Sequence, residues 1–387
     1  MVGEIVLPVD RAPELEITDR AWVEVDIQAL GRNCQAVAEY VGPQAAIVAV
    51  VKADAYGHGA LPVARTLLAN PRVQALAVAT LKEGIALRTG GITAPILVLG
   101  ACGSELELRS LLHYHLEPTL VSYPQAEAFS NFLQGHQQRL RVHINVDTGM
   151  SRLGVPWSEA INFINHVAQA PCLEIVSVYS HLATADDLDL TTCLLQKHRF
   201  DQVINHLPKS YKFHLANSAG ILADRDCHYD WVRPGLLLYG LYPASHLSSQ
   251  IQVSPVMSVR ARVTMVKHLL AGTGVSYGHR FITPQDMTIA VIGIGYADGV
   301  PRALSNQMQV LIRGQRACQV GTITMDQLMV DASSLPDLQV GEIATLIGTD
   351  TQTSISADDW AEATQTISWE ILCGFKSRLP RVNINDY

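Results

Sequence analysis

The sequence predicts an α/β protein, with an N-terminal TIM (β/α)8 barrel followed by a C-terminal, mainly β domain. Over the first two-thirds of its 387 residues, short apolar runs alternate with longer helix-like segments. Beyond residue 245 the pattern changes to strands whose polarity alternates. The length exceeds one ordinary core and matches one barrel of about 250 residues plus a smaller partner.

Eight apolar runs support the barrel. They recur roughly every 20 to 35 residues, which leaves room for one strand and one crossover helix each. They are apolar on both faces, as parallel strands covered on both sides should be. The alternative, an open doubly wound sheet, usually has fewer strands. The runs span 46–51, 75–79, 96–99, 118–121, 142–146, 175–179, 212–215 and 231–237, and helix-like segments span 61–68, 81–88, 123–133, 158–168 and 189–206.

A serine- and proline-rich stretch, 242–254, is typical of a linker. Strand-like runs follow it, and the first of them alternates with period two, as in a half-buried antiparallel strand. We therefore expect an N-terminal extension over 1–20, the barrel over 21–245 and a β-rich domain over 246–387. The alternating segment 21–27 precedes the barrel and is able to pack with the β domain. The later runs span 256–266, 288–294, 309–313, 317–320, 327–331 and 342–347.

Composition and charge exclude several classes of protein. The formal net charge of −8 argues against a general nucleic-acid binder. No apolar run approaches the roughly 18 residues of a membrane span. The first twenty residues carry acidic side chains instead of a basic n-region, so we expect no signal peptide. Seven scattered cysteines without a CxxC motif indicate a reducing compartment, and we expect a soluble cytoplasmic protein that needs no metal.

Lys52 ends the first apolar run, IVAVVK. Active sites of TIM barrels lie at the C-terminal ends of the strands, so this lysine should face the barrel mouth. Partial desolvation there lowers the pKa of an amine and makes it a nucleophile, as a Schiff-base lysine requires. The alternative is a lysine solvated on the rim.

Other strand ends carry polar residues that suit a ligand. Arg152, flanked by glycines, suits a carboxylate clamp, and His181 suits a group that tunes a neighbour. Ser218 and the backbone N–H groups of Gly235 and Leu236 follow runs seven and eight, where barrels often bind phosphate. Taken singly, each has a structural alternative: a loop arginine, a core histidine or a common turn.

Together, an amine on the first strand and a phosphate cup on the last two point to pyridoxal phosphate, which binds a lysine as an imine. Arg233 would then lie near the pyridine nitrogen. An arginine is effectively always charged and cannot play the usual carboxylate's part there. The ring would stay unprotonated and be a weaker electron sink, which disfavours side reactions.

At these residues the sequence resembles the alanine racemases, which are fold-type III pyridoxal-phosphate enzymes. The resemblance covers most of the chain in family order. Its motifs are VVKADAYGHG around 51–59, DTGMSRLG at 147–154, SHLATAD at 180–186, ANSAG at 216–220, VRPGLLLYG at 232–240, GVSYGH at 274–279, IGYADGVPR at 294–302 and TMDQ at 324–327.

The resemblance implies two catalytic bases. Lys52 is one, and Tyr277 is the other, reaching in from the β domain of a second subunit of a homodimer. A tyrosine with its ordinary pKa of about 10 is a poor base and needs help. The family pattern implies that His181 contacts the hydroxyl of Tyr277 and that Arg233 lies behind His181.

The resemblance also implies the binding residues. Cofactor contacts are implied for nine residues, which are Lys52, Tyr56, His181, Asn217, Ser218, Arg233, Gly235, Leu236 and Tyr296. Arg152 and Met325 are implied to hold the substrate carboxylate, and Asp186 and Arg302 to lie at the substrate entrance, with Asp326 in support.

Three positions depart from the family pattern. Asn145 stands where many members carry a carbamate-modified lysine, so a bound anion such as chloride is one substitute for the missing charge. Thr322 and Ser377 stand where an arginine and an entrance tyrosine are common. These changes affect the expected pocket size and substrate strictness more than the reaction type.

The expected activity is interconversion of L- and D-alanine, with D-alanine supplied for peptidoglycan. Three alternatives stay open. They are a serine or broad-specificity racemase, a fold-type III amino-acid decarboxylase and a non-catalytic pyridoxal-phosphate-binding protein. Arg233 argues against the decarboxylase, and a β domain carrying Tyr277 and Met325 argues against the binding protein.

Overall fold

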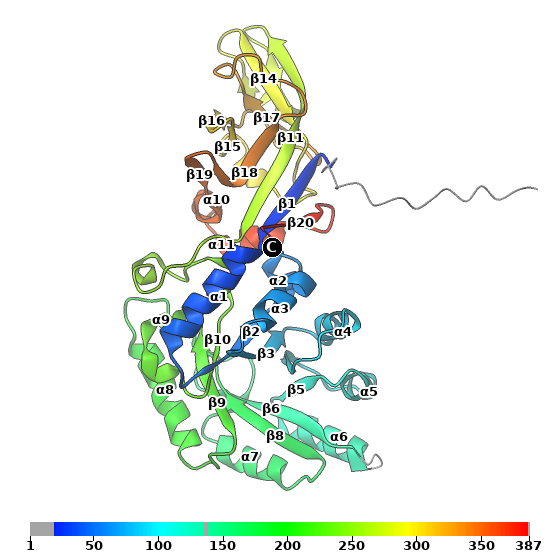
Figure 1. Cartoon of the computed structure of the whole chain (residues 1–387), viewed down its shortest axis with the longest axis vertical. Helices are drawn as coiled ribbons and strands as arrows, with labels where there is room; N and C mark the ends of the chain where they lie inside the picture. The colour runs from blue at the N-terminus through cyan, green and yellow to red at the C-terminus, as the bar shows by residue number, and fades with distance from the viewer. Residues whose placement is uncertain (1–18, 135–137, 386–387) are drawn as a thin grey trace, which may run out of the picture. The chain divides into compact units, whose positions relative to one another are not determined.

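The computed structural model describes residues 19–134 and 138–385, which form two compact units (Figure 1). The barrel unit comprises the described residues of 24–258, 365–375 and 383–387. The β unit comprises those of 1–23, 259–364 and 376–382. The sequence-based division placed all of 246–387 in the second domain, whereas this grouping assigns 246–258, 365–375 and the described residues of 383–387 to the barrel unit.

Eight parallel strands close into a barrel, which confirms the predicted fold class. Each predicted run overlaps one strand. The strand order is β5-β4-β3-β2-β10-β9-β8-β6, and pairing of β5 with β6 completes the ring. The strands are β2 Ala46–Val50, β3 Val73–Val78, β4 Ile96–Ala101, β5 Glu117–Leu120, β6 Leu140–Asp147, β8 Leu173–Tyr179, β9 Lys212–Asn217 and β10 Trp231–Arg233, with the short β7 Val155–Pro156 beside β6.

Helices lie outside the barrel strands, as Figure 1 shows for α4 to α8. Two of them begin with a capping box, in which Thr80 pairs with Glu83 and Ser104 with Glu107. Helix α1 begins directly after a strand, because Asp26 accepts a hydrogen bond from the Ala29 N–H at 2.7 Å. The helices of the barrel unit are α1 Ile27–Val41, α2 Lys52–Tyr56, α3 Ala60–Leu68, α4 Leu81–Thr89, α5 Glu105–His113, α6 Tyr123–Gln134, α7 Ala160–Ala168, α8 Thr191–Ile204, α9 Ser218–Ala223 and α11 Ser368–Gly374.

The barrel interior has an apolar half and a polar half. A buried apolar cluster gathers side chains of β2, β3, β4 and β10, among them Val48, Ala77 and Trp231. Strands β5, β6, β8 and β9 instead contribute buried polar side chains, among them His143 and His214. The apolar half matches the usual barrel core, and the polar half needs a separate explanation.

The β unit is built on a second sheet with the order β16-β15-β18-β11-β1-β20, to which β14, β17 and β19 add. Strand β1 covers most of the alternating segment 21–27, and it pairs in this sheet. All six predicted runs overlap strands here. The elements are β1 Ala21–Asp26, β11 Met257–Leu269, β12 Gly274–Val275, β13 Phe281–Ile282, β14 Met287–Ile292, β15 Gln309–Ile312, β16 Gln315–Cys318, β17 Leu328–Asp331, β18 Ile343–Asp350, β19 Thr353–Ile355, β20 Arg381–Ile384 and helix α10 Ala357–Thr364.

In the part of the chain that the structure describes, no helix combines the length and apolar character needed to cross a membrane.

Candidate active site

The C-terminal ends of the barrel strands surround a cavity of about 560 Å³. Residues of the barrel unit line it, and they include every barrel residue selected from the sequence as a site candidate. The shared position follows from the fold, because the C-terminal ends of parallel barrel strands meet at one face. The selected residues are Lys52, Tyr56, Asn145, Arg152, His181, Asp186, Asn217, Ser218, Arg233, Gly235 and Leu236.

Lys52 is the first residue of α2, a short turn that follows β2 and in which the backbone after Lys52 is left-handed. The four residues 53–56 have φ between 52° and 54°. This conformation costs an L-residue roughly 1–2 kcal/mol, so neighbouring groups must hold it. Glu83 is one of them, because its Oε1 accepts a hydrogen bond from the Ala53 N–H at 2.8 Å. The turn brings both Lys52 and Tyr56 to the cavity wall.

The surroundings of Lys52 favour its neutral amine. Burial lowers its pKa, and the positive charge of Arg152 lowers it further, while Glu83 opposes the shift. A larger fraction of the amine is therefore unprotonated and nucleophilic at neutral pH than for a solvated lysine.

Ser218 and Gly235 form a polar corner on another wall. The Ser218 oxygen accepts hydrogen bonds from the N–H groups of Gly235 at 2.9 Å and Leu237 at 3.5 Å. With both lone pairs in use, the hydroxyl hydrogen is left to donate to a ligand oxygen. A Cβ at Gly235 would lie 2.6 Å from Tyr56 Oη, so the glycine makes room for this tyrosine. The corner thus offers a hydrogen-bond donor to an anionic group.

Asn217 has a structural task in the same loop. Its Oδ1 accepts a hydrogen bond from the Gly220 N–H at 2.9 Å, which caps α9, and its Nδ2 donates to the Leu182 carbonyl at 3.4 Å. These bonds fix the start of the helix that carries Ser218.

Arg233 is a buried cation that orients two histidines. Its guanidinium donates to His214 Nδ1 at 2.8 Å, to His181 Nδ1 at 3.3 Å and to the Ser180 carbonyl at 2.6 Å. Because a guanidinium only donates, each of these ring nitrogens accepts, and a neutral His181 carries its hydrogen on Nε2. Burial and the charge of Arg233 lower the pKa of His181 to about 3, so its ring is neutral at physiological pH.

The loop 147–154 presents Arg152 to the cavity. Asp147 Oδ1 closes the loop by accepting hydrogen bonds from the N–H groups of Gly149 at 2.9 Å and Ser151 at 3.0 Å. Among the described residues the Arg152 guanidinium has no hydrogen-bond or ion-pair partner. Its parallel N–H groups are available for a carboxylate.

Asn145 is buried in the cavity wall beside this loop. A Cβ on Gly154 would lie 2.9 Å from the Asn145 carbonyl oxygen, so the loop packs directly against it. The amide therefore supports the loop that carries Arg152, although it supplies no charge.

Five further candidates lie in the β unit and do not line this cavity. They occupy loops that hydrogen bonds join to one another. Thr322 Oγ1 donates to the Tyr277 carbonyl at 2.8 Å, and the Tyr296 N–H donates to the Thr324 carbonyl at 3.0 Å. Tyr277 is 72% exposed and Met325 is 53% exposed. The five residues are Tyr277, Tyr296, Arg302, Met325 and Asp326.

The other departures from the family pattern also lie in the β unit. Thr322 is buried, and its hydroxyl bonds to the loop that carries Tyr277. Its short side chain makes this local contact at a position where an arginine would extend further. Ser377 is exposed. Asp326 pairs with Arg378 at 2.8 Å.

Sequence reasoning missed several cavity residues. Trp369 and Cys373 come from α11, which lies far along the chain in a segment assigned to the β domain. Leu99 and Gly100 lie within β4 and carry no chemical signal. Tyr179 ends the predicted run 175–179 and was not selected as a site residue.

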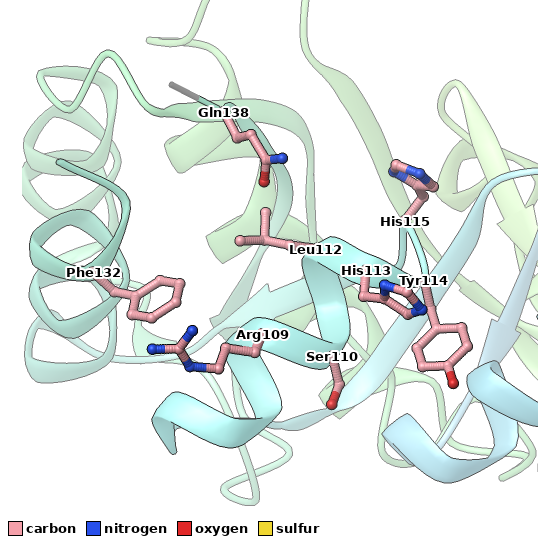
Figure 2. Close-up of a pocket in the computed structure, with 8 residues that line it drawn as sticks. All are labelled: Arg109, Ser110, Leu112, His113, Tyr114, His115, Phe132 and Gln138. Atoms are coloured by element: carbon pink, nitrogen blue, oxygen red, sulfur yellow. The ribbon is translucent and has the colours of Figure 1, made fainter. Parts of the chain in front are cut away.

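A second hollow is lined by residues of α5 and α6, by 114–115 and by Gln138 (Figure 2). It measures about 620 Å³, and Figure 2 shows Arg109, Leu112 and Phe132 on its walls. The Arg109 guanidinium lies 5.3 Å from the Phe132 ring centre and is paired with Glu105. None of the candidate site residues lines this hollow, and we therefore assign the candidate active site to the barrel cavity. In the described chain, no group of three or more His, Cys, Asp or Glu side chains could hold a metal ion.

Comparison with known proteins finds one family over most of the chain. Residues 25–243 match the alanine racemase N-terminal domain, and residues 256–383 match the alanine racemase C-terminal domain. An alanine racemase of Nostoc sp. (strain PCC 7120) is 55% identical over 95% of this chain and 96% of its own length.

Two solved structures show the same fold. An alanine racemase of Clostridium difficile 630 is 32% identical with a TM-score of 0.90, and the match covers 95% of this chain and 97% of that one. An alanine racemase from Bartonella henselae with covalently bound pyridoxal phosphate is 33% identical with a TM-score of 0.85, and it covers 95% of this chain and 100% of that one.

Proposed function

The chain belongs to the alanine racemase family, and we propose that it interconverts L- and D-alanine with pyridoxal phosphate bound covalently at Lys52. One observation carries the proposal. A single cavity brings together an amine of lowered pKa, a corner that donates to an anion, and an arginine with unused donors. An isomerase that supplies D-alanine for peptidoglycan is the role that the resemblance implies.

The residues present fit this cofactor. Lys52 would hold it by a covalent bond, and the Ser218 hydroxyl beside Gly235 and Leu236 would hold its phosphate, with Tyr56 next to them. The similar alanine racemase from Bartonella henselae, solved with covalently bound pyridoxal phosphate, supports this assignment. When bound, pyridoxal phosphate is an electron sink that makes the Cα–H bond of an amino acid acidic.

Arg233 is the residue that we assign to the pyridine end of the cofactor. Burial lowers its pKa to about 10, so it remains a cation at neutral pH. A cation that only donates hydrogen bonds would keep a neighbouring ring nitrogen unprotonated. Arg233 would thereby limit electron withdrawal by the bound cofactor and favour simple proton return over competing reactions.

Inversion at Cα requires proton transfer on two opposite faces, and we assign these faces to Lys52 and Tyr277. A single base would tend to return the proton to the side that it left. The exposure of Tyr277 and Met325 on joined loops suits residues that reach into the cavity of a second copy. His181, neutral with its hydrogen on Nε2, would support the Tyr277 hydroxyl, and Arg152 would hold the substrate carboxylate.

The test is chiral chromatography after incubation of the pure protein with L-alanine, with and without added pyridoxal phosphate. L-serine and L-lysine run in parallel. We expect D-alanine to form well ahead of D-serine and D-lysine, and a Lys52→Ala variant to lose both this product and the absorbance of bound cofactor.

The same samples separate the alternatives. Faster formation of D-serine would replace alanine as the substrate, and carbon dioxide release would indicate a decarboxylase. Bound cofactor without any D-product would indicate a non-catalytic binding protein.

A further inference from the structure

A row of buried polar side chains crosses the interior of the barrel. Strands β5, β6, β8, β9 and β10 each contribute one, and each is at most 6% exposed. Barrel interiors are usually filled by branched apolar residues, and a buried polar group costs free energy unless it is hydrogen-bonded. The five residues are Glu117, His143, Ser177, His214 and Arg233.

Hydrogen bonds join these side chains into one continuous chain. Arg233 Nη1 lies 2.8 Å from His214 Nδ1, and His214 Nε2 lies 2.7 Å from Ser177 Oγ. Ser177 Oγ lies 2.6 Å from His143 Nδ1, and His143 Nε2 lies 2.8 Å from Glu117 Oε2. Glu117 is the first residue of β5 and Arg233 the last residue of β10, so the chain runs between opposite ends of the parallel strands.

The chemistry of Arg233 sets the direction of every bond. A guanidinium has no acceptor, so His214 Nδ1 accepts and a neutral His214 donates from Nε2 to Ser177. The Ser177 hydroxyl then has its hydrogen free for His143 Nδ1. His143 donates from Nε2 to the Glu117 carboxylate, which can only accept. All four donors point away from Arg233 and toward Glu117.

The two ends of the chain carry opposite charges. Arg233 forms no ion pair with a carboxylate in the part of the chain described, although it is 3% exposed. Such a buried charge is costly without compensation. The aligned dipoles of the intervening groups link it to Glu117, whose Oε1 also accepts from Arg141 at the barrel rim. Burial and the charge of Arg233 hold the pKa of His214 well below its usual value, in agreement with a neutral ring.

We propose that Glu117 is a positioning residue for the candidate active site, acting on Arg233 through His143, Ser177 and His214. It fixes one tautomer of each histidine and holds Arg233 as a cation in one orientation. The proposal depends on the proposed function in one respect only, which is that the group facing Arg233 in the cavity is pyridoxal phosphate.

The first test measures the tautomers in the unaltered protein. Nitrogen-15 NMR of protein labelled at the imidazole nitrogens distinguishes the Nε2–H tautomer, the Nδ1–H tautomer and the charged ring. From the hydrogen-bond directions we expect both His143 and His214 to carry a hydrogen on Nε2 and none on Nδ1. An Nδ1–H tautomer or a charged ring at either residue would overturn the proposal, and this result needs no variant to fold and no activity.

The second test cuts the chain far from the cavity. Glu117→Gln removes the terminal charge and Ser177→Ala removes the central link, although neither residue lines the cavity. We expect both variants to shift the absorption band of bound pyridoxal phosphate and to lower kcat about tenfold, as loss of an outer supporting partner typically does. The KM for alanine should change little.

Thr345→Val is the matched control. Thr345 is buried in β18 of the β unit, and its hydroxyl accepts a hydrogen bond from Arg260, so the variant also removes a buried polar contact but lies outside the chain and the cavity. This variant should keep the wild-type band and kcat. If Glu117→Gln and Ser177→Ala behave like Thr345→Val, the positioning role is wrong. A different outcome is that both histidines carry their hydrogen on Nε2 but the protein shows no racemase activity. That result would count against the proposed function and leave the hydrogen-bonded chain of side chains supported.

Discussion

At the scale of single residues, the cavity concentrates positive charge in an acidic protein. Lys52, Arg152 and Arg233 all line it, although the chain carries a formal net charge of −8. Their mutual repulsion and their burial lower the pKa of Lys52 and keep His181 neutral. A site of this kind suits a ligand with both a phosphate and a carboxylate, because two anionic groups would relieve the repulsion.

This repulsion predicts how Lys52 reacts when Arg152 is removed. Arg152→Leu should raise the pKa of Lys52, since the charge of Arg152 is the largest contribution to its lowering after burial. More amine is then protonated at neutral pH, and acylation of Lys52 should slow. Mass spectrometry after labelling of cofactor-free protein with acetic anhydride at several pH values measures this rate.

Arg109→Leu provides the control, because Arg109 is an exposed arginine paired with Glu105 on α5. Its loss should leave Lys52 labelling unchanged. Labelling that stays equally fast in Arg152→Leu would show that burial alone sets the reactivity of Lys52.

At the scale of elements, the strands were the most predictable part of the fold. Eight apolar runs became eight barrel strands, because residues covered on both faces leave a strong signal in sequence. Helix α1 was missed, since it starts at Ile27 directly after β1 without a glycine or proline. The role of helix α11 was missed because its residues line the cavity together with residues that are distant from them in the sequence.

The polar chain inside the barrel was missed for a different reason. His143 and Ser177 alternate with apolar neighbours in their strands, and such alternation usually marks a solvent-facing side. Here the polar side chains of the alternation face the barrel interior, so the pattern marks a buried face and not a solvent-facing one. Only closure of the sheet shows that these residues meet.

Two helices with the same capping box allow the role of the left-handed turn to be isolated. Glu83→Ala and Glu107→Ala each remove the acidic partner of a box, and each should cost about 1 kcal/mol of stability or less. Only Glu83 also bonds to Ala53, next to Lys52. We therefore expect Glu83→Ala alone to weaken the binding of pyridoxal phosphate.

Denaturant unfolding and absorbance titration with pyridoxal phosphate measure the two effects separately. Equal cofactor affinity in the two variants would mean that the turn keeps its shape without Glu83.

At the scale of the whole molecule, the candidate site residues are divided between two units. Eleven line the barrel cavity, and their meeting is predictable from strand order once the barrel is recognised. The roles of Tyr277 and Met325 follow from no such rule, because a tyrosine in a hairpin turn is usually only an exposed loop residue. Family resemblance alone selects them, and it assigns them to the cavity of a second subunit.

Subunit mixing tests this assignment. If the site is shared as proposed, Lys52→Ala would damage its barrel side and Tyr277→Phe the side that the partner supplies. A mixed dimer would contain one doubly altered site and one intact site, so random reassortment of two inactive variants should restore about a quarter of the wild-type activity. The measurement is racemase activity after the two purified variants are dissociated together and reassembled.

Lys52→Ala mixed with Arg152→Ala gives the opposite expectation, because both changes lie in the barrel unit. Each site of that mixed dimer has an altered barrel, and activity should not return. Recovery in the first mixture and not in the second would place Tyr277 in the partner's site. If neither mixture recovers while mixed dimers form, each chain must supply its own second base, and Tyr277 would lose its assigned role between subunits.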